Sequence, residues 1–148
     1  MTDGSVFTHR LTVRFRDCDA LGHVNNAVYF TYLEQARIAW WRHLGGSLEQ
    51  PLEGTRGSTI GLPGADTIIA HAECDYRAPA YMNDDLDIQL TLAASGRSSF
   101  TLHYAIVNAA TGRPIADGKT VSVTFDYATG RPIPIPDATR ALLERSRV

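Results

Sequence analysis

The segment from Val13 to Gly46 places the tightest constraint on how this chain can fold. It carries a strongly periodic helical pattern, in which apolar and aromatic residues recur three or four positions apart: Tyr29, Tyr32, Leu33, Ala36, Ala39 and Trp40. This spacing lines one face of an α-helix. Three more apolar residues lie off this stripe: Phe30, Ile38 and Trp41. A helix with apolar flanks is usually buried on more than one side, so we expect the rest of the chain to wrap around it.

Both ends of this helix carry residues that suit them. Asn25 or Asn26 can cap its start. Its other end has two basic residues, which favour the negative end of the helix dipole, and two glycines that stop the helix: Arg42, His43, Gly45 and Gly46. The first turn of a helix has unpaired backbone N–H groups. The sequence therefore places such groups beside Asp19 and His23.

Alternation with a period of two predicts strands before and after the helix. The first runs from Phe7 to Arg16, where Leu11, Val13 and Phe15 alternate with polar residues. Four more follow without an intervening helix: Asp66 to Arg77, Asp85 to Ser95, Ser99 to Asn108 and Pro114 to Tyr127. In the last of them the alternating apolar residues are Val121, Val123 and Phe125.

Turn residues join these strands. Gly96-Arg97 and residues 110–112 are hairpin-like connections, so the sheet is expected to be antiparallel there. Residues 46–64, rich in Gly, Pro, Ser and Thr, are predicted to form a mobile loop over a site, and residues 1–5 a loose terminus. After the PIPIP stretch, a short helix carrying Leu142 and Leu143 is expected from Asp137.

The order of elements is one strand, one long helix and then a run of antiparallel strands. A single sheet that curls around the helix buries both apolar patterns, so we predict one α+β domain, a size that 148 residues fit. The edge and outer face of such a sheet remain partly apolar, which favours a homodimer or a homotetramer.

Composition excludes several classes of function. A formal charge of −2 provides no field that would attract nucleic acid. The longest apolar runs are too short to span a membrane, and the first ten residues lack the apolar core of a signal peptide, so we expect a cytoplasmic protein. Cys18 and Cys74 match no zinc motif and are read as free thiols, and the five histidines show no ligand spacing, so no metal is expected.

The turn and helix start, D-C-D-A-L-G-H-V-N-N-A-x-Y from Asp17 to Tyr29, resemble the hotdog-fold acyl-CoA thioesterases of the 4-hydroxybenzoyl-CoA thioesterase type. The resemblance implies a single hotdog thioesterase domain over residues 1–148. It implies that Asp19 is the catalytic carboxylate and that the Asn26 N–H donates to the oxyanion. His23, Asn25 and Asn26 stand where the aromatic-acyl members commonly have apolar or aromatic residues, which looks more like the fatty-acyl and broad-specificity branch.

Thioester hydrolysis needs an attacking group and a donor for the charge that grows on the carbonyl oxygen, and a helix N-terminus can supply that donor. Asp19 can attack the carbonyl to form a mixed anhydride, or it can deprotonate a water; the sequence leaves both routes open. Asp17 is better explained as a turn acid. His23 can place a water or bind Asp19, Asn25 can contact the substrate, and Gly22 leaves room for the thioester.

Other residues are candidates for further roles. Glu34 on the helix is a less favoured base, because related hotdog subfamilies carry their acid there, and Arg37 offers it an ordinary ion pair. The family resemblance suggests that the hairpin at the Gly96-Arg97 turn meets the nucleotide of coenzyme A, through Arg97, Ser98 and Ser99. Arg97 is almost as well explained as a solvated charge.

The predicted reaction is hydrolysis of an acyl-CoA thioester to a free acid and coenzyme A, with no cofactor beyond the coenzyme A of the substrate. Acyl-carrier-protein thioesters are also possible substrates. Two other functions compete: a hotdog hydratase that adds water to an enoyl-CoA, and a non-catalytic module that binds acyl thioesters. The acyl group and its length are not determined by the sequence.

Overall fold

The computed structural model describes residues 6–44 and 66–147. Its elements, in chain order, are β1 (Phe7–Thr12), the 3-10 turn η1 (Phe15–Asp17), α1 (Val28–His43), β2 (Asp66–Tyr76), β3 (Asp85–Ser95), β4 (Ser99–Asn108), β5 (Pro114–Asp126), β6 (Arg131–Pro132) and α2 (Asp137–Arg145). The predicted order of strands and helices is confirmed. The two-residue strand β6 was not predicted.

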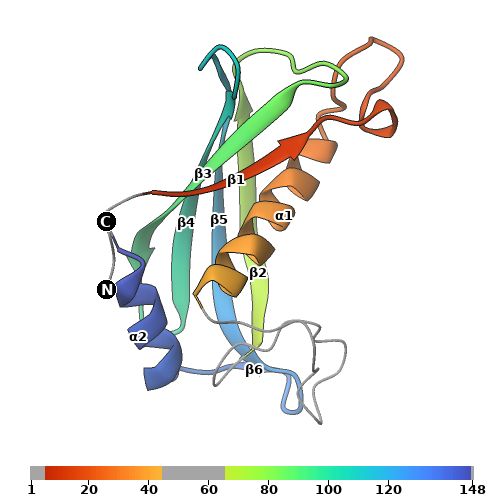
Figure 1. Ribbon diagram of the computed structural model, residues 1–148. Coiled ribbons are helices and arrows are strands. Elements are labelled where there is room, and N and C mark those ends of the chain that lie inside the picture. Colours follow the sequence, from red (N-terminus) through yellow and green to blue (C-terminus); the bar gives the residue numbers. More distant parts are fainter. Residues whose placement is uncertain (1–5, 45–65, 148) are drawn as a thin grey trace.

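All strands belong to one antiparallel sheet in the order β1-β3-β4-β5-β2, and β6 pairs with β5. Figure 1 shows α1 lying along one face of this sheet, while α2 lies at the end of the sheet where β3 turns into β4. The predicted α+β arrangement, with a sheet around one long helix, is therefore present. No helix within the described residues is long and apolar enough to cross a bilayer.

The core lies between α1 and the inner faces of β3 and β4. These two strands contribute alternate residues that are almost fully buried: Leu86, Ile88, Leu90, Phe100, Leu102, Tyr104 and Ile106. The helix contributes most of its predicted stripe, together with Trp41, whose ring meets Phe100 edge-on at 5.4 Å. Burying each of these large side chains stabilises the fold by about 1.5–3 kcal/mol. The opposite side of α1 carries Phe30 and Glu34, which are exposed, so residues 6–44 and 66–147 do not enclose the helix on that side.

The inner face of β5 differs from the sequence prediction. The residues that face the core are small or hydroxylated, and Thr120, Ser122 and Thr124 are almost fully buried, whereas Val121 and Val123 are only half-buried. Hydrogen bonds explain how the threonines tolerate burial. Thr120 Oγ1 shares a hydrogen bond of 2.6 Å with the Tyr104 hydroxyl, and Thr124 Oγ1 donates to Ile133 O at 2.5 Å. The alternation of β5 is real, but its buried face is the polar one.

Gly118 belongs to the buried face of β5, and a close approach between α1 and β5 explains why this residue is a glycine. A Cβ atom added at Gly118 would lie 2.8 Å from Leu33 Cδ1 and 3.0 Å from Leu33 Cδ2. Real carbon atoms do not approach so closely, and Leu33 is itself buried at 1% exposure. Gly118 therefore sets the distance at which the helix packs on the sheet.

Two local predictions at the start of the chain are wrong. β1 ends at Thr12, and Phe15 is 81% exposed, because Asp17 accepts the Arg14 N–H and closes a 3-10 turn that directs Phe15 away from the core. The N-cap of α1 is Ala27, which makes no side-chain capping bond. Asn25 acts earlier, since its Oδ1 accepts the Ala27 N–H. Gly45 and Gly46, residues 1–5 and the predicted loop up to Gly64 lie outside the described residues.

Replacing Gly118 with Ala is expected to lower the free energy of unfolding by about 1–3 kcal/mol, because the added methyl group overpacks the contact with Leu33. Urea unfolding followed by circular dichroism measures this. In a Leu33→Ala background the same substitution should cost much less, since the clashing atoms are gone. An equal cost in both backgrounds would show that Leu33 is not the cause.

Candidate active site

The predicted site residues lie on a short hairpin between η1 and α1. Asp17 O accepts the Asn25 N–H at 3.0 Å, Cys18 and Val24 form an antiparallel bridge, and Asp19 N–H donates to His23 O at 3.1 Å. The turn is closed by Gly22 N–H, which donates to Asp19 O at 3.0 Å. Gly22 has φ +87°, a conformation that favours glycine. The hairpin thus brings Asp19, Gly22, His23 and Asn25 together next to the start of α1.

The side chain of Asp17 ties this hairpin to the helix. It is 3% exposed, and its carboxylate accepts the Tyr32 hydroxyl at 2.8 Å, the Arg14 N–H at 3.0 Å and the Arg14 guanidinium at 2.9 Å. Burial alone would raise the pKa of Asp17, but these hydrogen bonds and the charge of Arg14 hold it below its ordinary value. The same contact, together with burial, raises the pKa of Tyr32. Asp17 is a structural acid, consistent with its prediction as a turn residue.

Asp19 has a different environment, although it is only two residues away. Its side chain is half-buried, and Oδ1 accepts the Leu21 N–H at 2.9 Å. Its second oxygen, Oδ2, has no hydrogen-bond partner in the part of the chain that the structure describes. Of the two neighbouring acids, Asp19 is therefore the one that has an oxygen free to meet a substrate or a water.

The backbone between Asn25 and Val28 has one unpaired donor. The N–H groups of Asn25, Ala27 and Val28 donate to Asp17 O, Asn25 Oδ1 and Asn25 O, at 3.0, 2.9 and 2.9 Å. The Asn26 N–H has no partner among residues 6–44 and 66–147. Asn26 is exposed, so this N–H is open to an incoming acceptor.

His23 contacts the backbone of its own hairpin. The ring is half-buried, and Nδ1 lies 3.2 Å from Val24 O. A carbonyl oxygen can only accept, so this contact requires a proton on Nδ1 and leaves Nε2 of a neutral ring as an acceptor. The predicted bond between His23 and Asp19 is not among the hydrogen bonds of the described residues.

The residues predicted to bind the nucleotide lie elsewhere. Thr12, which comes shortly before the hairpin of Asp19, pairs with Asp85 at the start of β3. The turn with Arg97, Ser98 and Ser99 follows the other end of β3, about 30 Å away along the 11 residues of that strand. Arg140 of α2 donates to Gly96 O at 2.8 Å and holds this hairpin. One chain alone does not bring these residues to Asp19.

Glu34 is exposed on the open side of α1. Its expected ion pair with Arg37 is not among the ion pairs of the described residues, and the Arg37 guanidinium donates instead to the Tyr104 hydroxyl at 3.3 Å. Nothing in these contacts connects Glu34 with the hairpin.

The two cysteines are free thiols, as predicted. Burial raises the pKa of Cys74 to about 11, with smaller contributions from Asp75 and Asp117. Its thiol therefore stays protonated near neutral pH, and a protonated thiol is a poor nucleophile. This environment favours a carboxylate over Cys74 as the attacking group.

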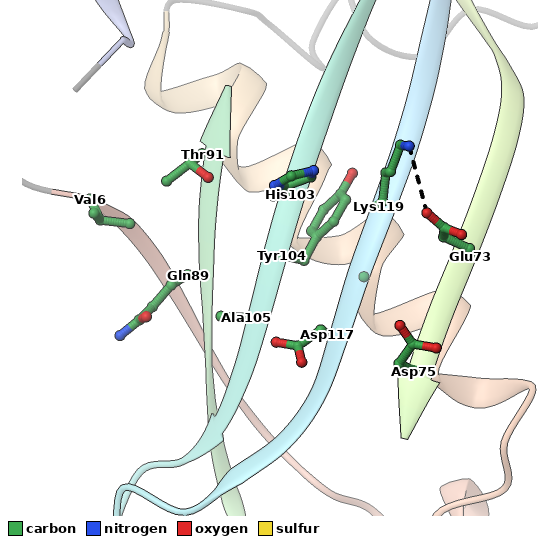
Figure 2. A pocket seen from close by; sticks show the side chains of 11 residues that line it. Val6, Glu73, Asp75, Gln89, Thr91, His103, Tyr104, Ala105, Asp117 and Lys119 are labelled. Atoms are coloured by element: carbon green, nitrogen blue, oxygen red, sulfur yellow. Dashed lines mark ion pairs between the residues drawn. The ribbon is translucent and has the colours of Figure 1, made fainter. Parts of the chain in front are cut away.

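A hollow of about 450 Å³ lies on the face of the sheet opposite α1 (Figure 2). Lys119 forms an ion pair with Glu73 at 3.7 Å within it, and His103 is the direct neighbour of Lys119 in the register of β4 and β5. None of the predicted site residues lines this hollow. It is therefore separate from the hairpin that carries Asp19.

Comparison with known proteins decides the family. The sequence profile of the thioesterase-like superfamily matches residues 13–143, which include the hairpin, α1 and the whole sheet from β2 onward. The chain belongs to this superfamily. Relatives of this chain are named as CoA hydrolases and acyl-CoA thioesterases, so the predicted class of enzyme, a thioester hydrolase, is confirmed.

Individual relatives of this thioesterase-like protein differ in substrate. It is 33% identical over 132 residues to a 1,4-dihydroxy-2-naphthoyl-CoA hydrolase of Synechococcus elongatus, covering 89% of this chain and 90% of that protein. It is 27% identical over 136 residues to the long-chain acyl-CoA thioesterase FadM of Escherichia coli, covering 92% and 96%. A solved thioesterase of Thermus thermophilus, complexed with coenzyme A and Zn, has a TM-score of 0.72 and 32% identity, with 93% and 90% of the chains covered. The hotdog fold is therefore confirmed.

Replacing Asp17 with Asn in this thioesterase is expected to lower the free energy of unfolding at pH 7 by about 2–3 kcal/mol, because it removes a buried charge-assisted network. The folded pKa of Asp17 is depressed, so its contribution is present above about pH 4, the ordinary value for Asp, and is lost as the pH falls through the folded pKa. The difference between wild type and variant should therefore shrink at acidic pH, as urea unfolding at several pH values would measure.

The matched control is Asp87→Asn, which breaks the ion pair with Arg10 (2.8 Å) on the sheet surface. Its cost should stay below about 1 kcal/mol. If both variants were equally stable, the buried network of Asp17 would not be the anchor described here.

Proposed function

We propose that this protein hydrolyses an acyl-CoA thioester to a free acid and coenzyme A, with Asp19 as the attacking or activating carboxylate and the Asn26 N–H as the oxyanion donor. The observation that carries the proposal is the unpaired Asn26 N–H at the start of α1, on the same hairpin as a carboxylate oxygen without a partner. The names of the relatives support the substrate class, since both of those described above act on acyl-CoA thioesters.

The reaction follows from these two groups. The thioester carbonyl oxygen accepts a hydrogen bond from the Asn26 N–H. This hydrogen bond strengthens as negative charge develops on the oxygen, and the positive end of the α1 dipole favours the same charge. Asp19 then attacks the carbonyl carbon, and the C–S bond breaks to release the thiolate of coenzyme A. Water hydrolyses the resulting mixed anhydride and restores the carboxylate. In the other route Asp19 removes a proton from a water that attacks directly.

The other hairpin residues are proposed to support this chemistry. Gly22 adds no side chain to the turn, and nothing lies within 4 Å of the position that a Cβ would take, so the space beside the turn is open. Asn25 shapes the turn through its bond to the Ala27 N–H, and the acceptor Nε2 of His23 can hold the attacking water. No cofactor is proposed beyond the coenzyme A of the substrate, and a cytoplasmic location stays a prediction.

Binding of the nucleotide by Arg97, Ser98 and Ser99 also stays a prediction, and the structure constrains it. Because that hairpin lies at the far end of β3, it can serve the hairpin of Asp19 most simply from a second copy of the chain. The solved relative with bound coenzyme A supports a coenzyme A site in this family.

We propose that the acyl group is either a fused aromatic acid or a long-chain acid, the two kinds of substrate in the names of the relatives. A thiol-release screen over short, medium, long and aromatic acyl-CoAs would define it. Including crotonyl-CoA and analysing its products separates the thioesterase from a hydratase, which would form a hydroxyacyl-CoA without releasing thiol. Saturable binding without any thiol release would indicate a binding module.

Replacing Asp19 with Asn is expected to lower kcat about 100-fold or more without changing the midpoint of urea unfolding, because the side chain is half-buried and keeps its shape. Steady-state thiol release measures the activity. Glu34→Gln is the control, and it should keep nearly full activity. The assignment would be reversed if Glu34→Gln abolished turnover while Asp19→Asn did not.

We further propose that the protein is a homodimer or a homotetramer that pairs through β2. This strand ends the sheet order, no further strand pairs with it among the described residues, and Ile68 and Ile69 on it are 41% and 39% exposed. The opposite edge, β1, has 6 residues against 11 in β2, and a short edge strand offers fewer backbone groups for pairing. Sedimentation velocity should show a dimer or larger assembly, and Ile68→Lys with Ile69→Lys should shift it toward monomer. A wild-type monomer at micromolar concentration would contradict this.

A further inference from the structure

We propose that Tyr76, at the end of β2, is a positioning residue whose hydroxyl aims the Asn26 N–H at the thioester carbonyl. The inference rests on the proposed function, because it assigns a role in the same oxyanion site. Tyr76 lies 50 positions from Asn26 in the sequence and carries no sequence signal for the site.

The direct evidence is one hydrogen bond at the critical place. The Tyr76 hydroxyl donates to Asn26 O at 2.8 Å. Burial and then Cys74 raise the pKa of Tyr76, so the hydroxyl remains a donor near neutral pH. The bond fixes the peptide plane on the C-terminal side of Asn26.

The peptide plane on the N-terminal side of Asn26 is fixed as well. Asn25 O accepts the Val28 N–H at 2.9 Å, and Asn25 N–H donates to Asp17 O at 3.0 Å. Accepting a hydrogen bond at this carbonyl also polarises the amide that carries the Asn26 N–H, which makes that N–H a stronger donor. With both planes held, the unpaired N–H has little freedom to turn away.

A row of tyrosines connects the hydrogen bond of Tyr76 with the carboxylate of Asp17. The Tyr76 ring meets Tyr29 edge-on at 5.2 Å, and Tyr29 meets Tyr32 edge-on at 5.9 Å. Tyr32 in turn donates to Asp17, whose backbone oxygen holds Asn25. The segment before α1 is thus held from β2 on one side and from the buried carboxylate on the other.

The exposure of Tyr76 separates its proposed role from a role in stability. Tyr76 is the last residue of β2, and in the single chain it is 48% exposed. Tyr76→Phe keeps the ring against Tyr29 and removes only the hydroxyl. A half-exposed hydrogen bond adds little to the free energy of unfolding, since water can replace it. Small displacements of an oxyanion donor, in contrast, have large effects on rate.

The test compares two variants in the full-length protein. Tyr76→Phe is expected to lower kcat about tenfold with KM within about twofold of wild type and an unchanged midpoint of unfolding. The matched control is Tyr127→Phe, which also removes a hydroxyl bond to a backbone carbonyl, at Thr67 O (3.2 Å), from a residue that is 39% exposed. Its kcat should equal that of wild type. NMR relaxation of the Asn26 amide should show increased motion only in Tyr76→Phe.

The outcomes distinguish the two levels of the proposal. If wild type releases no thiol from any acyl-CoA, the proposed function fails and the role of Tyr76 fails with it. If wild type is active, Asp19→Asn is inactive and Tyr76→Phe behaves like Tyr127→Phe, only the positioning role is overturned. A loss of activity in Tyr76→Phe that is accompanied by an equal drop in stability, with an unchanged Asn26 amide, also overturns it.

Discussion

The buried carboxylate of Asp17 is the interaction on which the site depends. It is held by Arg14 before it in the chain and by Tyr32 one turn into α1, while its backbone oxygen holds Asn25. These contacts join the end of β1, the hairpin and the helix into one unit. An acid that is buried and fully paired is costly to remove, so the unit is rigid. Asp19 and the Asn26 N–H, which the proposed chemistry needs, are placed by this unit.

The second constraint is the packing of α1 on the sheet. Gly118 and the small or hydroxylated residues of β5 leave room for Leu33, and the aromatic residues toward the end of α1 pack on Phe100. The helix axis is therefore set by the sheet, and its first turn by the hairpin. Tyr76 connects the hairpin to the end of β2, and Ala80 O, which accepts the Val24 N–H at 2.9 Å, connects it to the segment between β2 and β3. The site is supported by segments far apart in the sequence.

Much of the fold could be predicted because its signals are local. The period of α1 identified the helix, and the alternation of β3 and β4 predicted bounds that agree with the structure, because in each case a continuous apolar face packs on the core. The buried face of β5 was predicted wrongly, because its valines face outward and the burial of Thr120 and Thr124 depends on hydrogen-bond partners in other segments. Phe15 misled because a side-chain bond of Asp17 ends the strand early. For the site, the motif around Asp19 was visible, but the contact of Tyr76 with Asn26 spans 50 positions and exists only after folding.

The oxyanion donor proposed at Asn26 belongs to the main chain, and this has a consequence for how such proteins diverge. A side-chain donor disappears with a single substitution, whereas a main-chain N–H persists with any residue except proline at that position, provided that the loop keeps its shape. The proposed activation of the thioester carbonyl thus depends on the geometry of the backbone and not on which side chain stands at position 26. Descendants of this chain can remodel the surroundings of position 26 to accept new acids while retaining the means to activate them.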